Sequence, residues 1–78
     1  MQRGEIAVSS AGKDKGLWMA VVRTDDSGVY VINGREHPID KPKRKNPRHL
    51  QATGLTVAES DMETNRRLRR ALTNAAQK

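Results

Sequence analysis

The chain has 78 residues, enough for one small domain, and 35% of them are hydrophobic, with one Trp, one Tyr and no Phe. It has no cysteine, which excludes disulfides and thiolate metal sites and allows a reducing cytoplasm, and its formal net charge of +6 favours an anionic partner. The longest apolar run, Leu17 to Val22, is too short for a membrane span, and Met1 to Glu5 lack the apolar stretch of a signal peptide.

Three short apolar runs near the start of the chain predict β-strands. Residues 5–9 alternate with the period of two that is typical of a half-buried strand. Residues 17–23 are almost continuously apolar, and the turn sequence of residues 25–28 after them leaves no room for a helix. Residues 29–32 are rich in β-branched and aromatic side chains. We therefore expect three strands here, with Trp18 packed in the core or at its rim.

A glycine-bracketed loop, Gly12–Gly16, separates the first two expected strands. Glycine accepts left-handed backbone angles and lets another molecule come close. A tight loop would hold Lys13 and Lys15 at a fixed spacing at the end of a sheet, and this suits phosphate binding. Asp14 is expected to accept backbone amides within the loop. The alternative is an ordinary polar turn.

The next segment predicts a hairpin. Asn33 and Gly34 suit a two-residue type I′ turn, whose central positions both need positive φ. Residues 35–39 would then form the return strand. Pro38 lies within it, so the strand is expected at an edge of the sheet, and His37 is expected on its surface.

The excess of basic residues is concentrated in one segment. The net charge is −1 over residues 1–40, +5 over residues 41–58 and +2 over residues 59–78. We call residues 41–49 the basic stripe. A localised stripe on a balanced domain indicates a nucleic-acid surface, and a solvated loop is the alternative. Residues 48–51 are expected to form a last strand with Leu50 inward, and five short strands predict a small barrel.

The C-terminal part of the chain has the pattern of a helix from about Asn65 to Ala76. Its apolar residues recur at i, i+3, i+4 and i+7, at Leu68, Ala71, Leu72 and Ala75. Two starts are open, either a capping box of Ser60 with Glu63 or Thr64 as the N-cap. The other side carries arginines that form either a solvated face or a second phosphate-contacting surface, Arg66, Arg69 and Arg70.

No pattern in the chain predicts catalysis. Residues 9–13 resemble a phosphate-binding loop only in part, because its first glycine is missing and Asp14 stands where Ser or Thr would ligate magnesium. His37 and His49 belong to no cluster with metal-ligand spacing. No carboxylate pair lies in an apolar setting. We expect no enzyme, no metal and no cofactor.

The loop and the stripe together resemble a known family. A strand, a glycine-containing loop and a second strand resemble the KOW motif, and the chain is similar to short bacterial KOW-domain RNA-binding proteins, which are related to archaeal and eukaryotic large-subunit ribosomal proteins. The resemblance covers about three quarters of the chain. It is carried by Ile6, Val8, Gly12–Gly16, Val21, Val22, Lys41–Lys45, Arg48–Gln51 and Thr64–Leu72.

The resemblance implies a mostly β fold, a small five-stranded SH3-like (KOW) barrel followed by a basic loop and a C-terminal helix. The barrel would occupy residues 1–52, which include the basic segment 41–49. A linker would span residues 53–63 and the helix residues 64–78, and all three parts would form one domain. It also implies a cytoplasmic, non-catalytic module that binds folded RNA, most of all ribosomal RNA. The contact residues would be Lys13, Lys15, Gly16, Lys41, Lys43, Arg44, Lys45, Arg48 and His49.

Two other functions stay open from the sequence. One is a protein-interaction module of the transcription or translation machinery, which would dock its partner on the apolar face of the helix. The other is a DNA-binding domain. His49 is expected either to hydrogen-bond a phosphate or 2′-hydroxyl, or to pack beside Leu50. Few aromatic residues are available to stack bases, so the expected contacts are to phosphate and sugar. Five such contacts predict a log–log salt slope of roughly −3.5 to −4.5.

Overall fold

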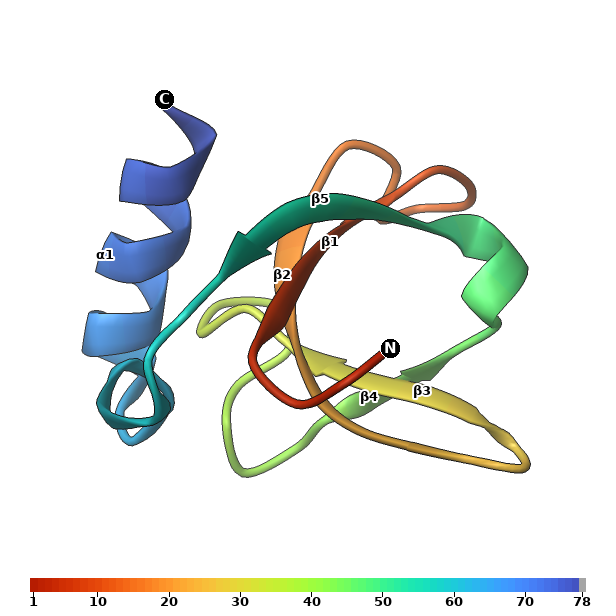
Figure 1. Cartoon of the computed structure of the whole chain (residues 1–78), viewed down its shortest axis with the longest axis horizontal. Coiled ribbons are helices and arrows are strands. Elements are labelled where there is room, and N and C mark those ends of the chain that lie inside the picture. Colours follow the sequence, from red (N-terminus) through yellow and green to blue (C-terminus); the bar gives the residue numbers. More distant parts are fainter. Residues whose placement is uncertain (78) are drawn as a thin grey trace.

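Five antiparallel strands form one sheet in the computed structural model, which describes residues 1–77 (Figure 1). The strand order is β4-β3-β2-β1-β5. The sheet curls, and a 3-10 turn, η1 (Pro47–His49), connects β4 to β5. No ladder joins β4 to β5 in the described part of the chain, so the sheet is open. The strands are β1 (Glu5–Ser9), β2 (Trp18–Asp25), β3 (Gly28–Ile32), β4 (Lys43–Lys45) and β5 (Leu50–Thr56).

The first three predicted strands are confirmed with small changes in their ends. β1 has the predicted bounds, β2 runs two residues further, and β3 begins one residue earlier, at Gly28. β2 is central, with β1 and β3 on its two sides. It is therefore covered on both faces over its first half, as its continuous apolar run indicated.

The predicted hairpin after β3 is wrong, and the side chain of Asn33 explains why. Its Oδ1 accepts hydrogen bonds from the backbone amides of Arg35 and His37, both at 2.9 Å. The amide of Asn33 donates to the carbonyl of His37 at 2.8 Å. This side chain competes with a strand ladder for the amides of the loop. Residues 35–39 therefore form no strand, and β4 pairs with β3 instead.

The segment expected as a linker, residues 53–63, is mostly ordered secondary structure. β5 continues through it to Thr56, and a second 3-10 turn, η2, spans Glu59–Met62. The expected final strand over residues 48–51 is right only from Leu50, because Asn46 and Pro47 start η1 instead. Leu50 is buried, as predicted.

The helix α1 spans Asn65–Ala76, the predicted bounds. Its N-cap is Thr64, whose hydroxyl accepts the amide of Arg67 at 3.1 Å. The alternative capping box is wrong, because Ser60 lies inside η2 and Glu63 caps its end. Of the segment predicted as helical, residue 78 lies outside the described residues. No helix in residues 1–77 is long and apolar enough to cross a membrane.

Two apolar clusters lie on opposite faces of the sheet. One face packs against α1 and η2, and its buried residues are Ile6, Ala20, Ile32, Met62, Leu68 and Leu72. Trp18 is partly buried against this cluster. The inner face of the curled sheet holds Ala7, Met19, Val21, Val29, Val31 and Leu50. Leu68 and Leu72 of the apolar stripe of the helix are thus buried against the sheet.

Gly34 lies in the loop after β3 and packs against the first turn of the helix. A substitution at Gly34 therefore tests this packing directly. Its φ is +78°, and a Cβ there would meet the carbonyl oxygen of Asn65 at 2.6 Å. Gly54 has nearly the same φ, +80°, with nothing within 4 Å. We expect G34A to lower the free energy of unfolding by about 2–4 kcal/mol and G54A by about 1 kcal/mol, since only the first must displace the helix. Urea unfolding measures both, and equal losses would contradict this packing.

Candidate nucleic-acid interface

The loop Gly12–Gly16 is a tight turn at one end of the sheet. Gly12 and Gly16 both have positive φ, +77° and +90°, as the sequence predicted for this loop. The amide of Gly16 donates to the carbonyl of Ser9 at 2.8 Å, and the amide of Leu17 donates to the carbonyl of Asp14 at 2.8 Å. These bonds fix the backbone on which Lys13 and Lys15 stand.

The side chain of Asp14 ties this loop to two other parts of the fold. Its Oδ2 lies 2.8 Å from His37 Nε2 and 2.5 Å from Lys45 Nζ. Each of these three side chains is only 14% exposed. The prediction that Asp14 accepts amides of its own loop is wrong, and so is the expectation that His37 is a surface strand residue. The carboxylate instead connects the loop to β4 and to the loop after β3.

These contacts change the ionisation of Asp14. The hydrogen bond from Lys45 lowers the pKa of the Asp14 carboxyl below its ordinary value of 3.8. Burial acts in the opposite direction, and the contact with His37 adds to the lowering. Asp14 is therefore an anion at neutral pH and binds Lys45 as an ion pair.

Lys13 and Lys15 are left as exposed cations by this arrangement. Asp14 lies between them in sequence and is held against β4 and His37. Neither lysine forms an ion pair within residues 1–77. Asp14 thus fixes the loop, while Lys13 and Lys15 on either side of it keep charges that are unpaired within residues 1–77.

The turn η1 brings more basic side chains to the same end of the molecule. Asn46 Oδ1 accepts the amide of Arg48 at 2.9 Å, and Pro47 takes the first helical position, where no amide is needed. The carbonyl of His49 accepts the amide of Ser10 at 2.8 Å. Arg48 and His49 are both exposed. We call Lys13, Lys15, Gly16, Arg48 and His49 the loop-end surface.

The remaining residues of the basic stripe do not share one surface. Successive residues of a strand point to opposite faces, so Arg44 points away from Lys43 and Lys45. Arg44 donates from Nη1 to the carbonyl of Ser27 at 2.8 Å, at the turn between β2 and β3. Lys45 is used in the ion pair with Asp14. Lys41 and Lys43 are exposed, before and at the start of β4.

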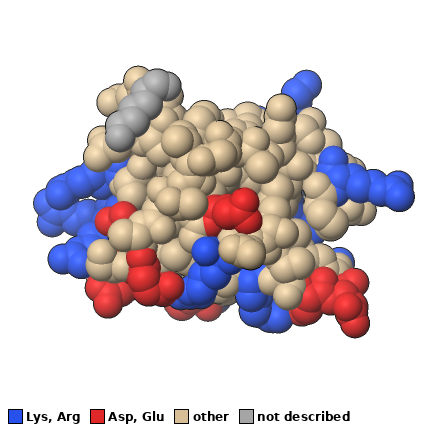
Figure 2. Space-filling model, in the orientation of Figure 1, with Lys and Arg blue, Asp and Glu red and all other residues tan. Residues whose placement is uncertain are grey.

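Acidic residues lie close to Arg44. Asp25 and Asp26 line the same shallow depression as Arg44, beside the turn. Hydrogen bonds from Ser27 lower the pKa of Asp25 to about 2, so that carboxylate is charged at neutral pH. A charged carboxylate at this turn repels a polyanion. Figure 2 shows Lys and Arg at both ends of the molecule and also along its lower side, where they alternate with Asp and Glu.

The described residues hold no group of three His, Cys, Asp or Glu that could bind a metal ion. Every buried side-chain nitrogen and oxygen in residues 1–77 has a hydrogen-bond partner. The contact between Asp14, His37 and Lys45 was missed by the sequence analysis. Its members are far apart in the sequence, and only the arrangement of the strands brings them together.

The Asp14 contacts predict a pH-dependent stability. A carboxyl whose pKa is lowered by folding stabilises the protein above its unfolded pKa, and this contribution is lost as the pH falls through the folded pKa. We expect D14N to unfold about 1–3 kcal/mol more easily than the wild type near neutral pH. The gap should close as the pH falls from 3.8, the ordinary value, through the lowered pKa of the Asp14 carboxyl in the folded protein. Urea unfolding of both proteins across this range measures it, and a constant gap would contradict a role for the charge.

No protein-family model matches the chain, and no curated protein matches it.

Proposed function

We propose that this chain is a non-catalytic RNA-binding module of the KOW type, and that its loop-end surface binds phosphates of folded RNA. The observation that carries the proposal is the arrangement around Asp14. One partly buried ion pair fixes the loop, and Lys13, Lys15 and Arg48 are exposed. Cations at fixed positions bind a phosphate backbone without reading its sequence.

An SH3-like barrel is part of this proposal. The strand order places β5 beside β1 at one edge and β4 beside β3 at the other. The sheet curls so strongly that a 3-10 turn of three residues is enough to connect these two edge strands (Figure 1). The curl, the order and the position of η1 support a barrel that is open between β4 and β5.

Folded RNA suits the loop-end surface better than single strands or duplex DNA. Single-strand binding usually needs aromatic side chains that stack on bases. Trp18 and Tyr30 are both partly buried, and Arg23 lies 3.8 Å above the Tyr30 ring. The loop-end surface also has no helix that could enter a major groove, because η1 has only three residues. We propose ribosomal RNA in the cytoplasm as the target, as the resemblance implies.

The test is the binding of a folded ribosomal RNA fragment over a series of salt concentrations. Three phosphate contacts at the loop-end surface predict a log–log slope of roughly −2 to −3. Duplex DNA added as a competitor should displace the RNA poorly. Displacement at equal DNA and RNA concentrations would favour the DNA-binding alternative, and the absence of any RNA binding would refute the proposal.

A further inference from the structure

A second group of exposed cations lies on α1, away from the sheet. We call Arg66, Arg67 and Arg70 the helix arginine patch. All three are exposed, while Leu68 and Leu72 on the other side of the helix are buried. Arg69 is not a member, because its Nη1 donates to the carbonyl of Gly34 at 2.8 Å.

Within residues 1–77, one ion pair involves the patch, and it is weak. Arg67 contacts Glu63 at 3.4 Å, but both side chains are more than half exposed, and such pairs contribute little. In residues 1–77, Arg66 and Arg70 form no ion pair. Arg70 also lies four residues after Arg66 and three after Arg67, which are spacings at which like charges destabilise a helix. Stability of the isolated domain therefore does not explain the patch.

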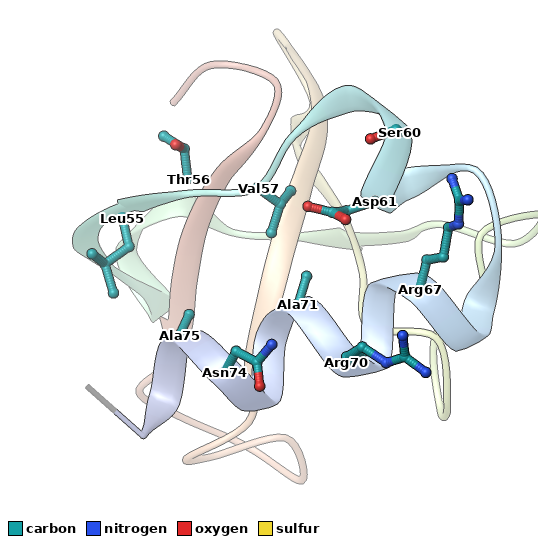
Figure 3. Close-up of a pocket in the computed structure, with 10 residues that line it drawn as sticks. All are labelled: Leu55, Thr56, Val57, Ser60, Asp61, Arg67, Arg70, Ala71, Asn74 and Ala75. Atoms are coloured by element: carbon teal, nitrogen blue, oxygen red, sulfur yellow. The ribbon is translucent and has the colours of Figure 1, made fainter.

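The patch borders a groove of about 480 Å³ between the end of β5, η2 and the helix. Arg67 and Arg70 lie at one end of it, and the rest of the lining includes small apolar side chains of both walls (Figure 3). Asn74 and Ser60 add polar groups. Asp61 is also present, and its carboxylate accepts the amide of Ala58 at 3.1 Å. Cations beside small apolar and hydrogen-bonding groups suit the alternating phosphates and sugars of RNA.

The helix arginine patch and η1, which carries Arg48 and His49 of the loop-end surface, lie toward opposite ends of the molecule, and the loop Gly12–Gly16 lies between them along that axis. Figure 1 shows α1 at one end of the longest axis and η1 at the other. That axis measures 27 Å. Figure 2 shows Lys and Arg at both of these ends. Cationic side chains at opposite ends of so small a domain cannot all face a single short RNA stem.

We propose that the domain bridges two RNA segments, one on the loop-end surface and one on the helix arginine patch. This inference rests on the proposed function, because it assigns the second surface to the same class of ligand. The protein would then hold two parts of a folded RNA together, rather than coat one of them.

The experiment uses the full chain and two short ribosomal RNA stem-loops, one labelled with a donor fluorophore and the other with an acceptor. Energy transfer should appear with wild-type protein and fall again at excess protein, when each RNA has its own copy. R66Q/R67Q/R70Q and K13Q/K15Q/R48Q should each lose transfer at least about tenfold while still binding one stem-loop. R3Q/R23Q/R35Q removes the same charge from other sites and should keep the transfer. Circular dichroism checks that each variant is folded.

The outcomes separate this inference from the proposed function. If no protein binds either stem-loop, both are refuted. If single stem-loops bind but R66Q/R67Q/R70Q transfers energy like the wild type, only the bridging inference is overturned. A protein dimer carrying one RNA on each copy would give that second result, so it also counts against bridging.

Discussion

Neutralising Lys13, Lys15 and Arg48 together is expected to weaken binding to folded RNA roughly 100-fold near physiological salt. Each phosphate contact contributes about 0.7–0.9 units to the log–log salt slope. At about 0.15 M salt, one contact therefore raises the binding constant roughly fivefold. The three side chains are exposed, and none forms an ion pair within residues 1–77, so their removal should not disturb the fold.

The control for this prediction is R3Q/R23Q/R35Q, which lowers the net charge by the same three units. Arg3 and Arg23 are paired with Glu59 and Asp25 in exposed ion pairs, and neither arginine belongs to the loop-end surface. Fluorescence anisotropy with one folded RNA measures both variants. A similar loss in the two would mean that only net charge matters, and the loop-end surface would have no special role.

Leu68→Ala is expected to have the largest effect on stability. Leu68 is 0% exposed and packs with Ile6, Ala20 and Ile32 between the helix and the sheet. Truncating a fully buried leucine costs about 2–5 kcal/mol. A domain of this size has about 3–5 kcal/mol of stability from its core. The variant should therefore be largely unfolded at room temperature, with the sheet lost together with the helix.

Leu55→Ala is the matched control, because it makes the same chemical change at a side chain that is 37% exposed. Leu55→Ala is expected to lower the free energy of unfolding by less than about 1 kcal/mol. Urea unfolding followed by circular dichroism compares the two. If both variants were as stable as the wild type, the helix would not be an integral part of the domain, and its apolar face would be available to a partner.

The local patterns in the sequence predicted the parts of the fold that depend on local physics. The helix has the predicted bounds because its apolar period and the Thr64 cap agree. β1, β2 and β3 follow from apolar runs between strong turn signals. The prediction of a return strand after Asn33 was wrong. Asn and Gly suit both a hairpin turn and a loop in which the Asn side chain accepts backbone amides, and only the packing of Gly34 on the helix decides between the two.

The sequence indicated which segments carry the candidate site, but not the contacts that hold them. The glycine loop and the charge of the basic stripe were visible in the sequence. The ion pair that uses Lys45, and the strand alternation that turns Arg44 toward Ser27, were not. Both depend on the pairing of β4 with β3, which no local pattern indicated. The basic stripe is therefore not one continuous surface. The loop-end surface instead combines two separate segments, the loop Gly12–Gly16 and the turn η1.

The central claim is that the loop-end surface contacts RNA, and an NMR titration tests it most directly. On addition of a folded ribosomal RNA stem-loop, we predict that the largest backbone amide shifts occur at residues 12–16 and at Arg48 and His49. The turn of residues 25–28, where Asp25 is a charged carboxylate beside Arg44, should change little. RNA binding that leaves residues 12–16, Arg48 and His49 unperturbed would contradict the account.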